Sequence, residues 1–79
     1  MRTLGQIPHQ GAVISLFAWN GKFIVKIEQG LLEQTFKFDQ LDFENEADFR
    51  AKIDASFLDE VVEGFKKMRA TWEKVSAET

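Results

Sequence analysis

Few side chains in this sequence could do covalent chemistry, and their spacing does not bring them together. The chain has one histidine, His9, and no cysteine, so a nucleophile would have to be a serine activated by that histidine. Three serines are present: Ser15, Ser56 and Ser76. His9 lies between Pro8 and Gly11, in a segment that is a poor platform for catalytic geometry. The pattern indicates an exposed histidine, and we expect no enzyme.

A run of acids is the second candidate for chemistry, because carboxylates bind divalent cations. Five acids stand close together with no base among them: Asp39, Asp42, Glu44, Glu46 and Asp48. A calcium loop also needs a glycine at its sharp turn and a spaced bidentate glutamate, and the run has neither. Acids are favoured before and inside the first turn of a helix, which explains the run without a metal. A glycine-rich phosphate loop is missing too, so the sequence predicts no metal and no cofactor.

The element that would position binding residues is a β-hairpin. Residues 12–19 and 22–29 have the composition of strands, and they flank Asn20-Gly21. Asn-Gly between two such runs is the strongest short hairpin signal, because both residues tolerate positive φ. A two-residue loop fixes the register, so the two runs are expected to pair residue by residue.

That register sorts the side chains of the hairpin onto two faces. One face is wholly apolar and must meet the core: Ile14, Leu16, Ala18, Phe23, Val25 and Ile27. The other face is mixed, with apolar residues beside polar and charged ones: Ser15, Phe17, Trp19, Lys22, Ile24, Lys26 and Glu28. If the chain turns again at Gln29-Gly30, a third strand adds Lys37 to this mixed face and pairs Glu33 with Lys26.

The mixed face has two interpretations. Aromatic residues interleaved with lysines on an open sheet bind single-stranded nucleic acid, by stacking and by contact with phosphates. Alternatively a second layer covers the apolar residues, and that layer would be the N-terminal segment, a helix or another subunit. The net charge of −3 disfavours general attraction to phosphate, and therefore favours the second interpretation.

The C-terminal part of the chain is predicted to be helical. Asn45 is a good N-cap for a short helix at about 46–54, and Ser56 for a long one. The long helix has an apolar stripe at spacings of three and four residues: Leu58, Val61, Phe65, Met68, Trp72 and Val75. Twenty helical residues span roughly 30 Å, against about 26 Å for an eight-residue strand, so the end of this helix is expected to overhang the sheet. Three residues there are candidates for an oligomer interface: Met68, Trp72 and Val75.

Together these elements predict a single α+β domain. It has an irregular N-terminal arm at 1–11, a three- or four-stranded antiparallel β-meander within 12–43, and helices at 45–77 packed on one face. Leu41 and Phe43 alternate with polar residues and would supply the fourth strand. Gln34 falls on the apolar face and needs a polar partner there.

Composition agrees with a small soluble domain. Apolar residues make up 44% of the 79, which is enough for one core and too much for a disordered chain. The absence of cysteine fits a reducing cytoplasm. The longest apolar run is less than half of the roughly 20 residues that a membrane helix needs, and the first ten residues lack the apolar segment of a signal peptide. We therefore expect a cytoplasmic protein without membrane contact.

The whole chain resembles a family of short bacterial proteins of unknown function, on four motifs: GQIPH at 5–9, WNGK at 19–22, KIE at 26–28 and EQTFK at 33–37. The resemblance implies a shared fold and no activity or site. By architecture, antiparallel strands followed by a C-terminal helix are also similar to the Whirly and Pur-type proteins, which bind single-stranded nucleic acid. Fold does not imply function, and no binding motif of those proteins matches this chain residue by residue.

The sequence thus predicts a small non-enzymatic protein-interaction module. A homodimer is expected, and the partner is a second copy or another protein that meets the mixed face or the helix end. Binding of single-stranded nucleic acid through the mixed face is the alternative. No small-molecule substrate is evident from the residues.

Overall fold

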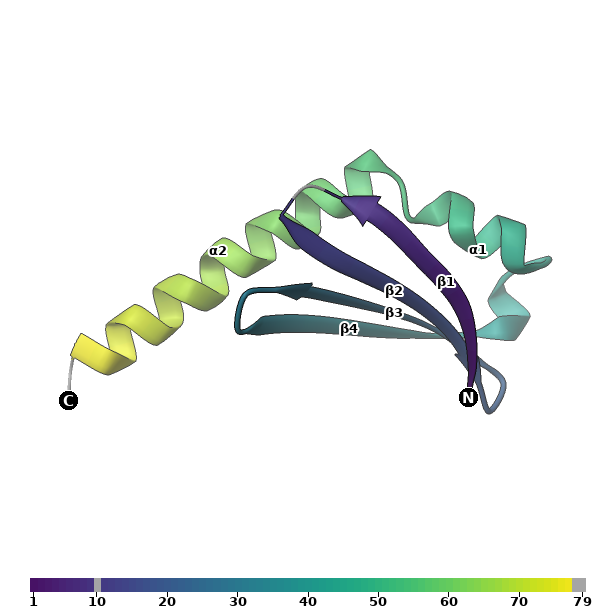
Figure 1. Cartoon of the computed structure of the whole chain (residues 1–79), viewed down its shortest axis with the longest axis horizontal. Coiled ribbons are helices and arrows are strands. Elements are labelled where there is room, and N and C mark those ends of the chain that lie inside the picture. Colours follow the sequence, from purple (N-terminus) through teal and green to yellow (C-terminus); the bar gives the residue numbers. More distant parts are fainter. Residues whose placement is uncertain (10, 78–79) are drawn as a thin grey trace.

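A computed structural model of the chain describes residues 1–9 and 11–77, which form a four-stranded sheet and two α-helices (Figure 1). The sheet is antiparallel with the strand order β1-β2-β3-β4. Its strands are β1 Arg2–His9, β2 Ala12–Trp19, β3 Lys22–Gln29 and β4 Leu32–Asp39. A 3₁₀ turn, η1 (Gln40–Asp42), leads to α1 (Glu46–Lys52) and α2 (Ala55–Ala77). The predicted α+β class, a meander with a short and a long helix, is confirmed.

The first predicted hairpin forms in the register that its Asn-Gly turn requires. Trp19 pairs with Lys22, and Phe17 pairs with Ile24. Asn20 has a φ of 52°, in the left-handed region that a type I′ turn needs at this position. All six apolar residues predicted for the core face of this hairpin are buried.

The N-terminal segment is a strand, so the expectation of an irregular arm at residues 1–11 is wrong. β1 pairs with β2, and the register shifts between Thr3 and Gly5, where Gly5 has a φ of 125°. The shift is a β-bulge, and Pro8 is tolerated because β1 is an edge strand. Glycine and proline are depleted in strands, which is why composition concealed this one. The fourth strand is therefore β1, and Leu41, which was expected in a strand, lies in η1.

The second hairpin turns at Gly30-Leu31, one residue later than predicted. Lys26 consequently pairs with Thr35, and the prediction that it pairs with Glu33 is wrong. The register is displaced by two residues, and an even displacement keeps each side chain on its predicted face. The later turn leaves the Leu31 side chain fully exposed at its tip.

The helices lie on the apolar face of the sheet (Figure 1). From this side the core receives four buried residues: Phe49, Ile53, Val61 and Phe65. Phe49 is central, because its ring stacks on that of Phe23 with the centroids 4.6 Å apart. No other element in the described ranges lies over the opposite face (Figure 1).

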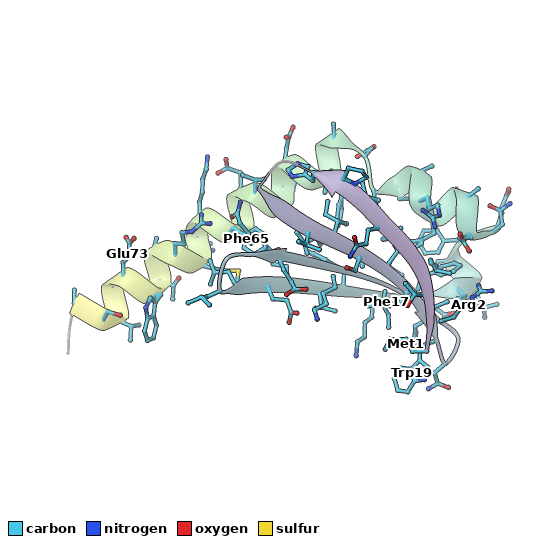
Figure 2. The ribbon with its side chains drawn as sticks, viewed as in Figure 1. Met1, Arg2, Phe17, Trp19, Phe65 and Glu73 are labelled. Atoms are coloured by element: carbon cyan, nitrogen blue, oxygen red, sulfur yellow. The ribbon has the colours of Figure 1, made fainter. Side chains whose placement is uncertain are left out.

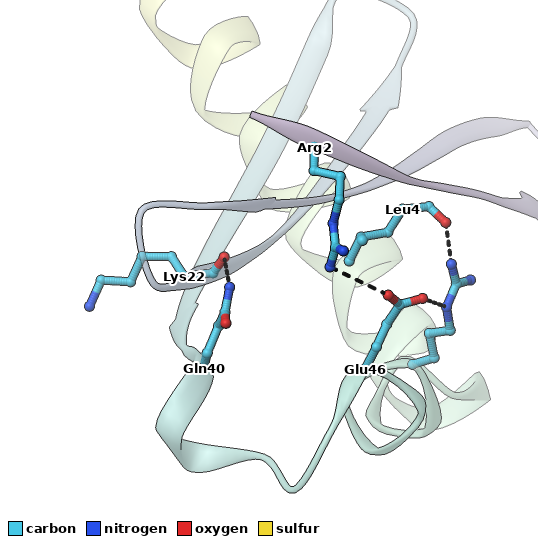
Figure 3. A network of polar contacts seen from close by, with 6 residues as sticks. Arg2, Leu4, Lys22, Gln40 and Glu46 are labelled. Atoms are coloured by element: carbon cyan, nitrogen blue, oxygen red, sulfur yellow. Dashed lines mark hydrogen bonds and ion pairs between the residues drawn. The ribbon is translucent and has the colours of Figure 1, made fainter.

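A polar network ties α1 to the edge strand β1 (Figure 3). Glu46 Oε2 accepts a hydrogen bond from Arg50 Nε at 3.0 Å, and Glu46 Oε1 lies 3.9 Å from Arg2 Nη2. Arg50 Nη2 also donates to the carbonyl of Leu4. The network occupies one backbone acceptor of an edge strand that would otherwise be open to pairing.

Gln34 finds its polar partner in α2. Its Nε2 donates to the carbonyl oxygen of Val61 at 2.9 Å. A Cβ added to Gly64 would lie 2.9 Å from the same nitrogen, so glycine provides the room in which the amide lies. This contact fixes where α2 crosses the edge strand β4.

Side chains cap the starts of both helices. Asn45 Oδ1 accepts from the amide of Asp48 at 2.9 Å, so the predicted cap of α1 is confirmed, although the helix ends at Lys52 rather than at residue 54. The predicted cap of α2 is wrong. Asp54 Oδ1 accepts from the amide of Phe57 at 2.9 Å, and the helix already begins one residue before Ser56.

Asp54→Ala is expected to lower the free energy of unfolding by about 1 kcal/mol, because the amide of Phe57 loses its acceptor. Ser56→Ala is the matched control and should change stability by less than about 0.5 kcal/mol. Urea denaturation followed by circular dichroism measures both variants. A larger loss for Ser56→Ala would contradict the assignment of the cap.

Gly64→Ala is expected to change the free energy of unfolding differently in the natural sequence and in a Gln34→Ala variant. Alanine is favoured over glycine inside a helix by about 1 kcal/mol, but here its Cβ would displace the amide of Gln34 from the Val61 carbonyl. The substitution should therefore give no gain in the natural sequence, and about 1 kcal/mol of stabilisation when Gln34 is already Ala. A double-mutant cycle in urea measures the difference, and equal effects in both backgrounds would show that the contact is unimportant.

Candidate functional site

Five of the six residues predicted for the mixed face line one shallow groove on the uncovered side of the sheet. The groove has a volume of about 280 Å³ and is lined by Met1, Phe17, Trp19, Ile24, Lys26, Glu33, Thr35 and Lys37. The strands bring these residues together because side chains two apart share a face. Figure 2 shows Met1, Phe17 and Trp19 close together at one end of the sheet, away from the helices. Lys22, the sixth predicted residue, lies beside the hairpin turn and outside the groove.

The apolar residues of the groove differ in exposure. Ile24 is only 5% exposed, because it belongs to the central strand β3 and has neighbours on both sides. Phe17 is half-buried, whereas Trp19 is 51% exposed and Met1 is 74% exposed. Neighbouring side chains of the same face therefore shield Ile24, and nothing in the described ranges covers the indole of Trp19.

Lys26 is paired with acids of the same face. Its Nζ lies 3.0 Å from Glu33 Oε1 and 3.7 Å from Glu28 Oε1. The hydrogen bond that Lys26 donates to Glu33, and then the charges of Glu33 and Glu28, raise the pKa of Lys26 above its ordinary value. Lys26 therefore stays protonated across the physiological pH range, and its positive charge is lost as the pH rises through this raised pKa.

The other two lysines of the face differ from one another. Lys22 Nζ lies 3.7 Å from Asp39 Oδ2, so it also has an acidic partner. Lys37 is exposed and has no ion pair within the part of the chain that the structure describes. Counted together, three lysines on this face stand beside three acids: Glu28, Glu33 and Asp39. The face carries no net charge, although its lysines alone made it look basic in the sequence.

Sequence reasoning missed two parts of this site. Met1 was missed because residues 1–11 were expected to be irregular, whereas β1 brings the N-terminus to the edge of the groove. Asp39 was counted with the acids of the following helix, but it ends β4 and pairs with Lys22. A signal for Asp39 was present, since the alternation of β4 places it on the same face as Glu33.

The three residues predicted for an oligomer interface lie in different environments. Met68 is half-buried and packs against the margin of the core. Trp72 is 67% exposed and Val75 is 46% exposed. All residues from Arg69 to Ala77 are exposed, and Figure 1 shows this end of α2 extending past the turn between β3 and β4. The predicted overhang of the long helix is confirmed.

A second groove lies between the overhanging helix and that turn. Its volume is about 530 Å³, and it is lined by Gln29, Gly30, Leu31, Leu32, Arg69, Trp72 and Glu73. Arg69 Nη2 donates to Gln29 Oε1 at 2.6 Å, which is the polar link between the helix and the turn. Leu31 was not predicted to lie at this groove, because the turn was expected at Gln29-Gly30 and forms at Gly30-Leu31.

The residues considered for chemistry do not converge. His9 lies in β1 opposite Ala12, and its buried Nδ1 has no hydrogen-bond partner among residues 1–9 and 11–77. Ser15 pairs with Gln6 and lies on the other face of the sheet. Within the same ranges no group of three or more histidine or acidic residues could hold a metal ion. No helix there is long and apolar enough to cross a membrane.

Fold and surface together define a two-layer α+β domain with one open sheet face and one overhanging helix. No protein-family model, no curated protein and no solved structure matches the chain. The resemblance to short bacterial proteins and the architectural similarity to Whirly and Pur-type proteins therefore stay predictions.

Titration with labelled dT and rU oligonucleotides at low salt is expected to give no saturable binding, because the acids of the mixed face neutralise its lysines. A Trp72→Phe variant lets Trp19 report alone, through quenching of its fluorescence. A Glu28→Gln/Glu33→Gln variant, whose face carries two fewer acids, should bind measurably and lose that binding as salt is added. Saturable, salt-sensitive quenching with the natural sequence would contradict this expectation.

Proposed function

We propose that the chain is a non-enzymatic protein-interaction module that acts as a homodimer and recognises another protein through the mixed face of its sheet. The observation that carries this proposal is the environment of Trp19. Its indole is 51% exposed beside Phe17 and Met1, on the face that the helices leave open. Tryptophan is among the residues that contribute most to protein–protein binding, and here it is available to a partner.

The surroundings of Trp19 have the composition of a protein interface. Such interfaces combine a central apolar patch with a polar rim of mixed charge. Here the apolar patch is Met1, Phe17 and Trp19, and Lys26 with Glu33 belongs to the rim. Charges that are already paired on the surface orient a partner with complementary charges and contribute modestly to affinity.

The hairpin does not require a large side chain at the position of Trp19. Trp19 stands next to the Asn20-Gly21 turn at the end of β2, where one of its sides faces solvent. A smaller polar residue would keep the hairpin register, because the turn sets that register. Trp19 does not stand alone, because it lines one groove with Met1 and Phe17, and a contiguous exposed apolar patch indicates a surface used for binding.

Single-stranded nucleic acid is the second candidate for the same face. The half-exposed Trp19 beside Phe17 favours it, since bases stack on aromatic side chains. The pairing of Lys22 and Lys26 with acids disfavours it, since phosphates would compete with carboxylates for both lysines. Of the three lysines on this face, only Lys37 lacks an ion pair in the described ranges, so we rank a protein partner above nucleic acid.

The homodimer is proposed on two grounds. A domain of this length buries a modest share of its surface, and association commonly adds stability to such domains. The overhanging end of α2 also leaves Trp72 and Val75 exposed in one stripe. Four further apolar residues have exposed side chains elsewhere: Met1, Val13, Leu31 and Leu41.

Trp19→Ser is expected to leave the free energy of unfolding within about 1 kcal/mol and to abolish capture of a partner protein. Asp59→Ser is the control for capture, because Asp59 is exposed on α2 and lies outside both the mixed face and the overhanging helix end. A photocrosslinking amino acid at Thr35, in the groove, should label the partner, and the same group at Glu60 on α2 should not. Undiminished capture with Trp19→Ser, or labelling from Glu60 alone, would remove the mixed face from consideration.

A further inference from the structure

The two ends of the molecule carry opposite charge. Residues 66–77 of α2 contain four bases and one acid, for a net charge of +3. Residues 39–54, which include η1 and α1, contain six acids and two bases, for a net charge of −4, and Arg2 and Lys22, which pair with Glu46 and Asp39, reduce the charge of this end to −2. The molecule is 47 Å long, and Figure 1 shows the C-terminal end of α2 and the η1–α1 region at opposite ends. The chain therefore has a charge dipole along its longest axis.

The positive end, which we name the basic end, also has a protruding apolar surface. It consists of Leu31, Arg69, Trp72 and Val75, and Lys74 adds positive charge on the other side of the helix. Trp72 is 67% exposed and Leu31 is fully exposed, on either side of the groove between the helix and the turn. Within the described part of the chain, Lys74 has no ion pair. The apolar stripe that fills the core at Phe65 continues here as the exposed Trp72 and Val75.

The negative end, which we name the acidic corner, has a recessed apolar surface. It consists of Leu41, Asp42, Phe43 and Glu44. Leu41 is 92% exposed, and Phe43 lines a cavity of about 300 Å³. The remaining lining residues of the cavity are Phe38, Phe49, Lys52, Ile53 and Phe57. Asp42 and Glu44 flank Phe43 and have no ion pair in the ranges described.

Hydrogen bonds hold the acidic corner in one conformation. Gln40 Nε2 donates to the carbonyl of Lys22 at 3.2 Å (Figure 3), and the Gln40 amide donates to the carbonyl of Gly21 at 3.0 Å. The amide of Leu41 donates to Asp39 Oδ1 at 3.0 Å. The corner is thus ordered before binding, which lowers the entropic cost of docking there.

We propose that the basic end of one copy docks on the acidic corner of a second copy, with Trp72 against Phe43 and its cavity, and that a two-fold axis repeats this contact. The inference rests on the homodimer of the proposed function and names the surfaces that form it. Each end supplies what the other lacks, because a protruding tryptophan meets an aromatic recess and a segment of net positive charge meets one of net negative charge.

A two-fold arrangement is favoured by the size of the contact. One aromatic side chain buries about 150–250 Å², well below the ~1,200 Å² of a stable interface. Two antiparallel copies lying side by side use both ends of each molecule and form the contact twice. A linear head-to-tail arrangement would leave one basic end free and would continue to grow.

The charges and the tryptophan have different roles in this contact. Exposed ion pairs contribute less than about 1 kcal/mol each, so burial of Trp72 supplies most of the affinity. The charges select the antiparallel arrangement, because parallel copies would place two positive ends side by side. The association therefore weakens as the salt concentration rises and screens the exposed charges.

The oligomeric state tests the proposal. Sedimentation equilibrium of the whole chain at low salt is expected to give the mass of two chains. Trp72→Ser should raise the dissociation constant at least tenfold, and Trp19→Ser is the matched control that should leave it unchanged. Both variants are expected to fold, because each tryptophan is more than half exposed. Circular dichroism checks that they do.

Charge reversal distinguishes the contact between the basic end and the acidic corner from other modes of dimerisation. Arg69→Glu/Lys74→Glu should dissociate the dimer, and so should Asp42→Lys/Glu44→Lys. The variant with all four substitutions should dimerise again, since the two signs are exchanged and still opposite. Restoration of the dimer is expected only if these two surfaces meet.

The outcomes distinguish this inference from the proposed function. A single-chain mass at every concentration would overturn both the inference and the homodimer, and would leave the Trp19 face untouched. A dimer that resists Trp72→Ser and both charge reversals would overturn the inference alone. A series of growing assemblies would overturn the two-fold arrangement.

Discussion

The hydrogen bond from Gln34 to the Val61 carbonyl, beside Gly64, sets where the longest element of the molecule meets the sheet. A polar side chain on an otherwise apolar face has to find an acceptor, and only one carbonyl in α2 supplies it. The bond acts together with burial of Phe65 to hold the first half of α2 over the core. The second half then has no sheet beneath it, because α2 is about 34 Å long and its buried residues, Val61 and Phe65, lie in its first half.

Two different surfaces result from this placement. Since both helices lie on one face, the opposite face of the sheet stays open and Trp19 stays in contact with solvent. Since α2 is longer than the strands, Trp72 and Val75 remain exposed beyond the turn. The two tryptophans of the chain therefore serve different proposed contacts, one with another protein and one with a second copy.

The register of the sheet decides the electrostatics of the open face. Lysines alternate with apolar residues along β3, and acids occupy the same face of β4. Pairing the two strands places Glu33 at 3.0 Å from Lys26 and Asp39 at 3.7 Å from Lys22. A surface that looks basic along one strand becomes neutral across two, which shifts the preferred partner from phosphate to protein.

Sequence alone determined the elements whose signals are local. The Asn20-Gly21 turn, the apolar face of the first hairpin and the stripe of α2 follow from φ preferences and side-chain periodicity within about twenty residues. Tertiary structure decided the rest. β1 forms a strand despite Gly5 and Pro8 because it pairs with β2. The second turn lies one residue later than predicted, and the resulting register shift of two residues keeps the same side chains in the core. The partner of Gln34 lies 27 residues away, and the neutrality of the mixed face depends on which strand lies beside β3. Interactions between segments distant in sequence leave no periodic signal, so only the folded chain could place them.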